Sequence, residues 1–266
     1  MAQHSRTSRR SPLVTVIIKA MEKVSRPMLR DFGELENLQV SRKGPADFVS
    51  VADIRTEKML KEELLLARPT FGFLGEESGE TKGAGESRFI VDPIDGTTNF
   101  LHGIPHFCIS IAVETNGEIV AGVIHDPVKQ ETFWAEKGEG AFMNDKRLRV
   151  SGRMYMNEAL LTTGIPCGER GNPKRVIKAL DAVSPHIAGI RRMGSAALDL
   201  AYVAAGRCDA YWEENVKLWD IAAGILIVKE AGGVVTDAQG GNTMLQTCSV
   251  LATNFNLHGE FLKLIK

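Results

Sequence analysis

The chain has 266 residues, of which 44% are hydrophobic and 24% charged, and its net charge is −1 at pH 7. These values are typical of a globular protein with a sizeable core, and the net charge of −4 after residue 12 argues against a nucleic-acid-binding protein. No apolar run approaches the roughly 20 residues that a membrane-spanning helix requires. The first twelve residues, MAQHSRTSRRSP, contain three arginines but no apolar segment, which predicts a flexible basic tail and not a secretory signal.

The first half of the chain shows two helical patterns followed by a series of strands. Apolar residues recur at helical spacing over residues 13–28, where Pro27 should kink or end the helix. A second helix begins near Asp53. Apolar runs predict strands, two of which are joined by an Asn116-Gly117 hairpin turn. The predicted strands cover residues 71–74, 88–92, 108–114, 118–124, 131–134 and 148–150.

The second half alternates strands with longer helical segments. Strands are predicted at residues 159–163, 209–212, 234–236 and 249–252, and helices at 174–182, 195–205, 220–231 and in a last segment that runs to 266. Hairpins combined with crossover connections predict a layered α/β protein with mixed sheets. We divide it into the tail, 1–12, and two halves, 13–150 and 151–266, that share a cleft.

The cysteines and histidines form no disulfide or zinc motif. Four cysteines without a C-x-x-C pair favour free, buried thiols in a reducing compartment, and hence a cytoplasmic protein. Two histidines lie four residues apart, but a proline between them makes this spacing unsuitable for a helical zinc site. Any metal must therefore be held by oxygen atoms. The cysteines are Cys108, Cys167, Cys208 and Cys248.

Acidic residues gather at the ends of predicted elements in three places. Grouped carboxylates repel one another, so they must take up protons, separate or bind a cation. Mg²⁺ accepts carboxylates, backbone carbonyls and waters as ligands, which makes it the expected ion. The acids are Glu76, Glu77, Asp92, Asp95 and Asp220, and the carbonyl of Ile94 is a further oxygen donor.

A glycine and two threonines follow the acids of the second group. Gly96 lets the backbone approach a ligand closely, and the N–H groups of the next residues, at a predicted helix start, form a pocket for an anion. Acids for metal ions beside N–H groups for a phosphate favour phosphoryl transfer to water. Each feature alone also fits a turn, a solvated loop or a helix cap, so the interpretation depends on their combination.

Four segments identify a family. The chain resembles the inositol monophosphatase family of Mg²⁺-dependent, typically lithium-sensitive phosphatases, from about residue 13 to the C-terminus. The resemblance implies an α-β-α-β-α layered sandwich that is usually a homodimer. The matching segments are GEES at 75–78, DPIDGTTNF at 92–100, GSAA at 194–197 and WDIAAG at 219–224.

The resemblance also implies roles for individual residues. Two or three Mg²⁺ ions would be held by Glu76, Asp92, the Ile94 carbonyl, Asp95 and Asp220. Glu76 and Thr97 would activate the water nucleophile, with Asp53 beside that threonine. The substrate would contact Asp95, Gly96, Thr97, Gly194, Ser195, Ala196, Glu213 and Asp220, in part through the main-chain N–H groups of Gly96 and Thr97.

The expected reaction is hydrolysis of a phosphate monoester, with myo-inositol 1-phosphate as the leading substrate. No phosphoenzyme is expected: the chain has no Cys-x5-Arg loop, and a metal-bound Asp92 or Asp95 would be a poor nucleophile. Relatives on this scaffold also hydrolyse fructose 1,6-bisphosphate, 3′-phosphoadenosine 5′-phosphate or histidinol phosphate. Lys217 and Glu214, in a variable stretch beside the sugar pocket, leave the substrate open. Lys43-Gly44-Pro45 precedes Asp47 where members of the family often carry a basic residue on a mobile loop.

A second alternative is a binding function. The segment RRMGSAALDLAYVAAGR at 191–207 resembles a bacterial branch of the family that is associated with transcription antitermination. Arg191, Arg192 and Arg207 would then form the basic contact surface. Ordinary solvation, or salt bridges in a dimer, would equally explain these arginines.

Overall fold

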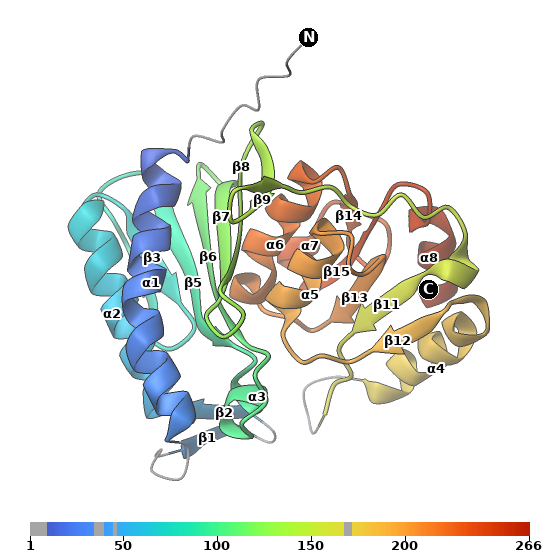
Figure 1. Cartoon of the computed structure of the whole chain (residues 1–266), viewed down its shortest axis with the longest axis horizontal. Helices are drawn as coiled ribbons and strands as arrows, with labels where there is room; N and C mark the ends of the chain where they lie inside the picture. Colours follow the sequence, from blue (N-terminus) through green and yellow to red (C-terminus); the bar gives the residue numbers. More distant parts are fainter. Residues whose placement is uncertain (1–9, 35–39, 45–46, 168–171) are drawn as a thin grey trace.

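The computed structural model describes residues 10–34, 40–44, 47–167 and 172–266 (Figure 1). Most of the predicted basic tail lies outside these residues, and so do the side chains of Lys43 and Asp47. In the described part, helix α1 begins at Pro12 and is capped by Ser11, whose side chain accepts the N–H of Val14. None of the described helices is long and apolar enough to cross a membrane.

The larger sheet has eight strands in the order β10-β9-β8-β7-β6-β5-β3-β4. Neighbouring strands are antiparallel except β3 and β5, which are parallel. The Asn116-Gly117 turn joins β6 to β7, and both of its residues have positive φ, 53° and 78°, as a tight hairpin turn requires. The strands are β3 (Gly72–Gly75), β4 (Gly79–Thr81), β5 (Ser87–Asp95), β6 (Cys108–Thr115), β7 (Glu118–Asp126), β8 (Glu131–Glu136), β9 (Gly140–Met143) and β10 (Lys146–Arg147).

Helices α1 (Pro12–Gly33) and α2 (Val51–Ala67) cover one face of this sheet, beside the short hairpin of β1 (Val40–Gly44) and β2 (Asp47–Ser50) (Figure 1). The apolar stripe predicted for α1 is buried against the sheet. Of the two effects predicted for Pro27, to kink or to end this helix, the second was wrong, because α1 continues to Gly33. A proline removes one backbone hydrogen bond, but burial of flanking residues such as Val24 and Met28 holds the helix together.

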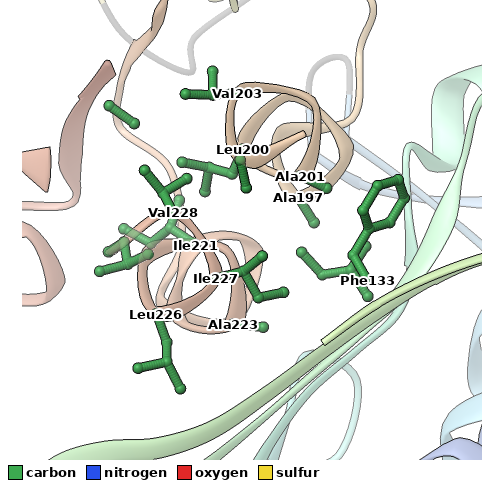
Figure 2. Close-up of a cluster of buried hydrophobic side chains, with 14 of the residues drawn as sticks. Phe133, Ala197, Leu200, Ala201, Val203, Ile221, Ala223, Leu226, Ile227 and Val228 are labelled. Atoms are coloured by element: carbon green, nitrogen blue, oxygen red, sulfur yellow. The ribbon is translucent and has the colours of Figure 1, made fainter. Parts of the chain in front are cut away.

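Helices α5 (Ala196–Ala204) and α6 (Leu218–Glu230) lie between the two sheets. Figure 2 shows their side chains meeting each other and Phe133 of the large sheet. A Cβ on Gly122 would lie 2.8 Å from the carbonyl oxygen of Ala223, and one on Gly224 would lie 2.5 Å from Leu200. Glycines at these two positions therefore let α6 approach both β7 and α5 closely.

The second sheet has five strands in the order β12-β11-β13-β15-β14. Helices α4 and α8 pack on its outer face (Figure 1), so the layers run α-β-α-β-α, which confirms the predicted fold class. The division of the chain at residue 150 stays a prediction. The remaining elements are α3 (Thr97–Leu101), η2 (Met156–Glu158), β11 (Leu160–Thr163), α4 (Pro173–Val183), η3 (Ser184–His186), β12 (Gly189–Arg191), β13 (Ala210–Glu214), β14 (Val234–Thr236), α7 (Met244–Thr247), β15 (Ser249–Thr253) and α8 (His258–Ile265).

Two smaller sequence predictions were wrong. Residues 148–150 do not form a strand: the N–H of Leu148 still bonds to the carbonyl of Ala141, but the N–H of Val150 bonds to the carbonyl of Ala231 after α6. All four cysteines are free, as predicted, but Cys167 is exposed and Cys248 only partly buried, instead of buried. Neither difference touches the elements that converge near the acidic residues.

Candidate active site

A cavity of about 400 Å³ lies where the acidic segments of both sheets meet the first turns of α5 and α6. Every residue predicted to bind metal or substrate lines this cavity, whereas Asp53 and the acid Glu77 are not part of the lining. The predicted residues in the lining are Glu76, Asp92, Ile94, Asp95, Gly96, Thr97, Gly194, Ser195, Ala196, Glu213 and Asp220. The lining also contains residues that were not in the predicted set, among them Thr98, Gly164 and Trp219.

The carboxylates in this cavity disfavour one another's ionisation. Asp92 is 2% exposed, and burial, followed by the negative charge of Glu76, raises its pKa well above the usual range. Burial also raises the pKa of Asp95, against hydrogen bonds that lower it, led by the one from Ser195. The pKa of Asp220 is raised by burial first and then by Asp95. A bound cation would remove this conflict, so the donor set suits an oxygen-binding divalent ion.

The carboxylates line the same cavity, but they are not preorganised as a complete set of metal ligands. Within the described ranges, no group of three or more His, Cys, Asp or Glu side chains is arranged to hold a metal ion. The oxygen donors and the raised pKa values of the aspartates therefore favour a metal site by their chemistry, without a preformed cage.

Asp95 joins the two halves of the site. Its Oδ2 accepts the hydroxyl of Ser195 at 2.5 Å and the N–H of Ala197 at 2.8 Å, across about a hundred residues of sequence. Ser195 is also the N-cap of α5, with its oxygen accepting the N–H of Leu198. The end of β5 is thus fixed to the first turn of α5, which places the segment 194–196 in the cavity.

Thr97 lies between two acceptors. Its Oγ1 is 3.0 Å from the carbonyl oxygen of Ile94 and 3.2 Å from Oδ1 of Asp53, a buried side chain on α2. The preceding Gly96 has φ of +100°, and a Cβ there would lie 3.1 Å from the carbonyl oxygen of His106. Glycine is therefore required at the turn that leads into α3.

The opposite wall of the cavity carries Glu213, near the end of β13. Its Oε2 accepts the hydroxyl of Tyr211 at 2.8 Å. A Cβ on Gly164 would lie 1.9 Å from the carboxylate of Glu213, so only glycine fits beside it. At the rim, Arg175 pairs with Glu214 at 2.9 Å. Glu213 therefore presents a carboxylate of fixed orientation to the cavity, from a strand far along the chain from the acids on β5.

The three arginines predicted as a basic surface have different surroundings. Arg192 lines the cavity, and Arg191 is exposed at the end of β12. Arg207 pairs with Glu131 at 2.5 Å and lies over the ring of Tyr202. Arg207 is therefore engaged within the chain.

Residues 9–266 match the family model described as "Inositol monophosphatase family". The chain belongs to this family. It is therefore a phosphoric monoester hydrolase, and its family is generally metal-dependent.

Proteins similar to this chain include some named inositol-1-monophosphatase and some named SuhB. The chain is 54% identical to an inositol-1-monophosphatase of Rhizobium meliloti (strain 1021), over 92% of each chain. It is 42% identical to a Nus factor SuhB of Xylella fastidiosa (strain Temecula1 / ATCC 700964), over 92% of this chain and 91% of that one. The crystal structure of the extragenic suppressor protein suhB from Bartonella henselae has a TM-score of 0.94 and 51% identity, over 96% of this chain and 99% of that one.

Sequence reasoning missed two residues that hold the site of this family member together. The Nδ2 of Asn99 donates to the carbonyls of His106 and Met193, both at 2.8 Å, and so ties α3 to the loop before Gly194. Glu57 on α2 binds the loop that carries Glu76. Asn99 lies inside the DPIDGTTNF segment, which was a usable signal, whereas Glu57 looks like an ordinary helical acid.

The burial of His106, beside the phosphatase site, leads us to expect that the protein loses stability in acid. Its ring contacts Tyr202 edge-on at 5.8 Å, and its Nε2 has no hydrogen-bond partner in the described part of the chain. Burial, followed by the positive charge of Lys129, lowers the pKa of His106 to about 4. The unfolded chain takes up this proton near pH 6.5. The free energy of unfolding should therefore fall between about pH 6.5 and pH 4 as the unfolded state binds the extra proton.

Urea unfolding of the wild type and His106→Gln between pH 8 and pH 4 measures this contribution. The variant should lose less stability across that range, whereas His186→Gln, at an exposed histidine, should follow the wild type. An identical pH dependence in all three proteins would contradict the assignment.

Proposed function

We propose that this protein is an Mg²⁺-dependent inositol-1-monophosphatase that converts myo-inositol 1-phosphate and water to myo-inositol and phosphate. The observation that carries the proposal is the shared cavity, in which buried carboxylates face the Gly96-Thr97 turn. The 54% identity to a protein named inositol-1-monophosphatase supports the substrate.

The residues present fit two or three Mg²⁺ ions. Glu76, Asp92 and the carbonyl of Ile94 would hold one ion, and Asp92, Asp95 and Asp220 a second, while Glu76 would help to hold a weaker third. All of these donors are oxygen atoms, as Mg²⁺ prefers, and burial raises the pKa values of the three aspartates, a conflict that a bound cation would relieve. When bound, the ions would lower the pKa of the attacking water and stabilise the leaving alkoxide.

The chain itself orients the water and the phosphate. Because the hydroxyl proton of Thr97 faces acceptors on Ile94 and Asp53, the lone pairs of Oγ1 are free to accept a hydrogen bond from the water. Glu76, on the adjoining wall of the cavity, takes the proton that this water loses. The N–H groups of Gly96 and Thr97 hold the phosphate in line with the attack.

Direct attack by water fits the hydrogen bonds of the aspartates. Oδ2 of Asp95 already accepts Ser195 and Ala197, and Oδ1 of Asp92 accepts the N–H of Ile94 at 3.0 Å. Carboxylates held in this way are poor nucleophiles. No phosphoaspartate should therefore be trapped during turnover.

The inositol ring would lie between the segment 194–196 and Glu213. We also propose a homodimer, as the family resemblance implies, and a cytoplasmic location, since all four cysteines are free. Neither proposal is needed for the chemistry.

A phosphate-release panel tests the proposed function. Purified protein should release phosphate from myo-inositol 1-phosphate faster than from fructose 1,6-bisphosphate, 3′-phosphoadenosine 5′-phosphate or histidinol phosphate. Release should require Mg²⁺, stop with EDTA and be inhibited by lithium. Faster release from one of the other three esters would reassign the substrate, and release that is unaffected by EDTA would overturn the metal-dependent mechanism.

A second candidate function is binding to a transcription complex. It is favoured by the 42% identity to a protein named Nus factor SuhB and by the exposed Arg191. A chromosomal Asp95→Asn allele separates the two functions. If the inactive protein still performs the cellular role, binding is the physiological function, and if it fails, catalysis is required.

A further inference from the structure

Helix α2 carries a second buried carboxylate one turn beyond Asp53. Glu57 is 2% exposed, and its Oε2 accepts the N–H of Glu77 while its Oε1 accepts the N–H of Ser78, both at 2.7 Å. Both carboxylate oxygens are therefore bonded to the loop that presents Glu76 to the cavity. Hydrogen bonds to an ionised acceptor are stronger than those between neutral groups.

This loop is held from two sides. The N–H of Glu76 donates to the carbonyl of Val91 on β5 at 3.2 Å, and the next two N–H groups donate to Glu57. A Cβ on Gly75 would lie 2.5 Å from the carboxylate of Glu57. Because Gly75 has no side chain, the carboxylate of Glu57 has room to reach the loop. The N–H groups of residues 76–78 are therefore fixed in direction.

Asp53 and Glu57 lie four residues apart, so they share a face of α2 and are separated by about 6 Å along its axis. Asp53 accepts the hydroxyl of Thr97, whereas Glu57 holds the Glu76 loop. We propose that α2 sets the spacing between the two groups that activate the water, and that Glu57 is the positioning residue for Glu76. The role of Glu76 in this proposal rests on the proposed function.

Two variants break this contact by different means. Glu57→Gln replaces one of the two acceptor oxygens by an NH₂ group, which faces a backbone N–H that needs an acceptor. Gly75→Ala leaves Glu57 in place but fills the space that its carboxylate occupies. Glu62→Gln makes the same chemical change as the first variant at an exposed position of α2 and is the matched control.

Both variants should raise the Mg²⁺ concentration for half-maximal activity by about 10- to 100-fold, as loss of groups that orient metal ligands does elsewhere. The Mg²⁺-dependent rise in unfolding temperature, which requires no turnover, should shift to higher Mg²⁺ by a similar factor. Hydrogen exchange at the N–H groups of Glu77 and Ser78 should be at least about 10-fold faster. Glu62→Gln should match the wild type in all three measurements.

Faster exchange at residues 77–78 with an unchanged Mg²⁺ dependence in both readouts would overturn the proposal, because Glu57 would then have only a structural role. Unchanged exchange in both variants would overturn it as well. Should Glu57→Gln fail to fold, Gly75→Ala decides the matter. If the wild type hydrolysed no phosphate ester, the proposed function would be wrong. The thermal measurement with Mg²⁺ would still decide whether Glu57 supports ion binding.

Discussion

Replacing Asp220 by asparagine is expected to lower turnover of myo-inositol 1-phosphate by at least about 100-fold with the fold intact. Asp220 lies in the first turn of α6, where its Oδ2 accepts the N–H of Lys217 at 2.7 Å. The amide oxygen of asparagine keeps this bond, so the change removes chiefly the charge. Phosphate release at saturating Mg²⁺ measures the loss.

The same substitution should not destabilise the metal-free protein. Burial and the charge of Asp95 raise the pKa of Asp220, so the folded state is penalised for holding it ionised at neutral pH. The unfolding temperature of Asp220→Asn in EDTA should therefore equal or exceed that of the wild type. The stabilisation by added Mg²⁺ should be smaller.

Asp181→Asn, at an exposed acid on α4, is the control and should leave both properties unchanged. Near-normal Mg²⁺-dependent turnover of Asp220→Asn would count heavily against the proposed mechanism. A large drop in its unfolding temperature in EDTA would instead mean that Asp220 serves the fold. Asp95→Asn should show the same loss of turnover.

Glu213→Ala should separate the recognition of the polyol from the chemistry at phosphorus. With myo-inositol 1-phosphate we expect kcat/KM to fall roughly 100-fold, because hydroxyl groups of the ring lose a fixed acceptor. With 4-nitrophenyl phosphate, which has no such hydroxyls, the loss should stay below about 5-fold. Parallel kinetics on the two esters provide the measurement.

The alanine variant also removes the acceptor of the buried Tyr211 hydroxyl, which costs about 1–3 kcal/mol of stability. Glu213→Gln keeps an acceptor for Tyr211 and isolates the effect of the charge. Equal losses on both esters in Glu213→Ala would show that Glu213 serves the metal ions or the fold.

Local signals in the sequence predicted much of the secondary structure. The turn at Asn116-Gly117 formed as expected, because a tight turn depends on a few neighbouring residues. The expectation that Pro27 would kink or end α1 was wrong about the end, since packing partners far away in the sequence stabilise that helix. Residues 148–150 have a strand-like composition, but the N–H of Val150 bonds to the carbonyl of Ala231 at the end of α6 instead of to a neighbouring strand.

The sequence alone determined which donors are available: acids, a glycine turn and threonines in segments that also resemble a known family. Only the tertiary structure decided which of them meet. The bonds from Asp95 to Ser195 and Ala197, and those from Glu57 to the Glu76 loop, join residues far apart in the chain. Such contacts depend on how sheets and helices pack, which a local pattern does not specify. That packing also places the carboxylates around one cavity, where burial raises the pKa values of the aspartates.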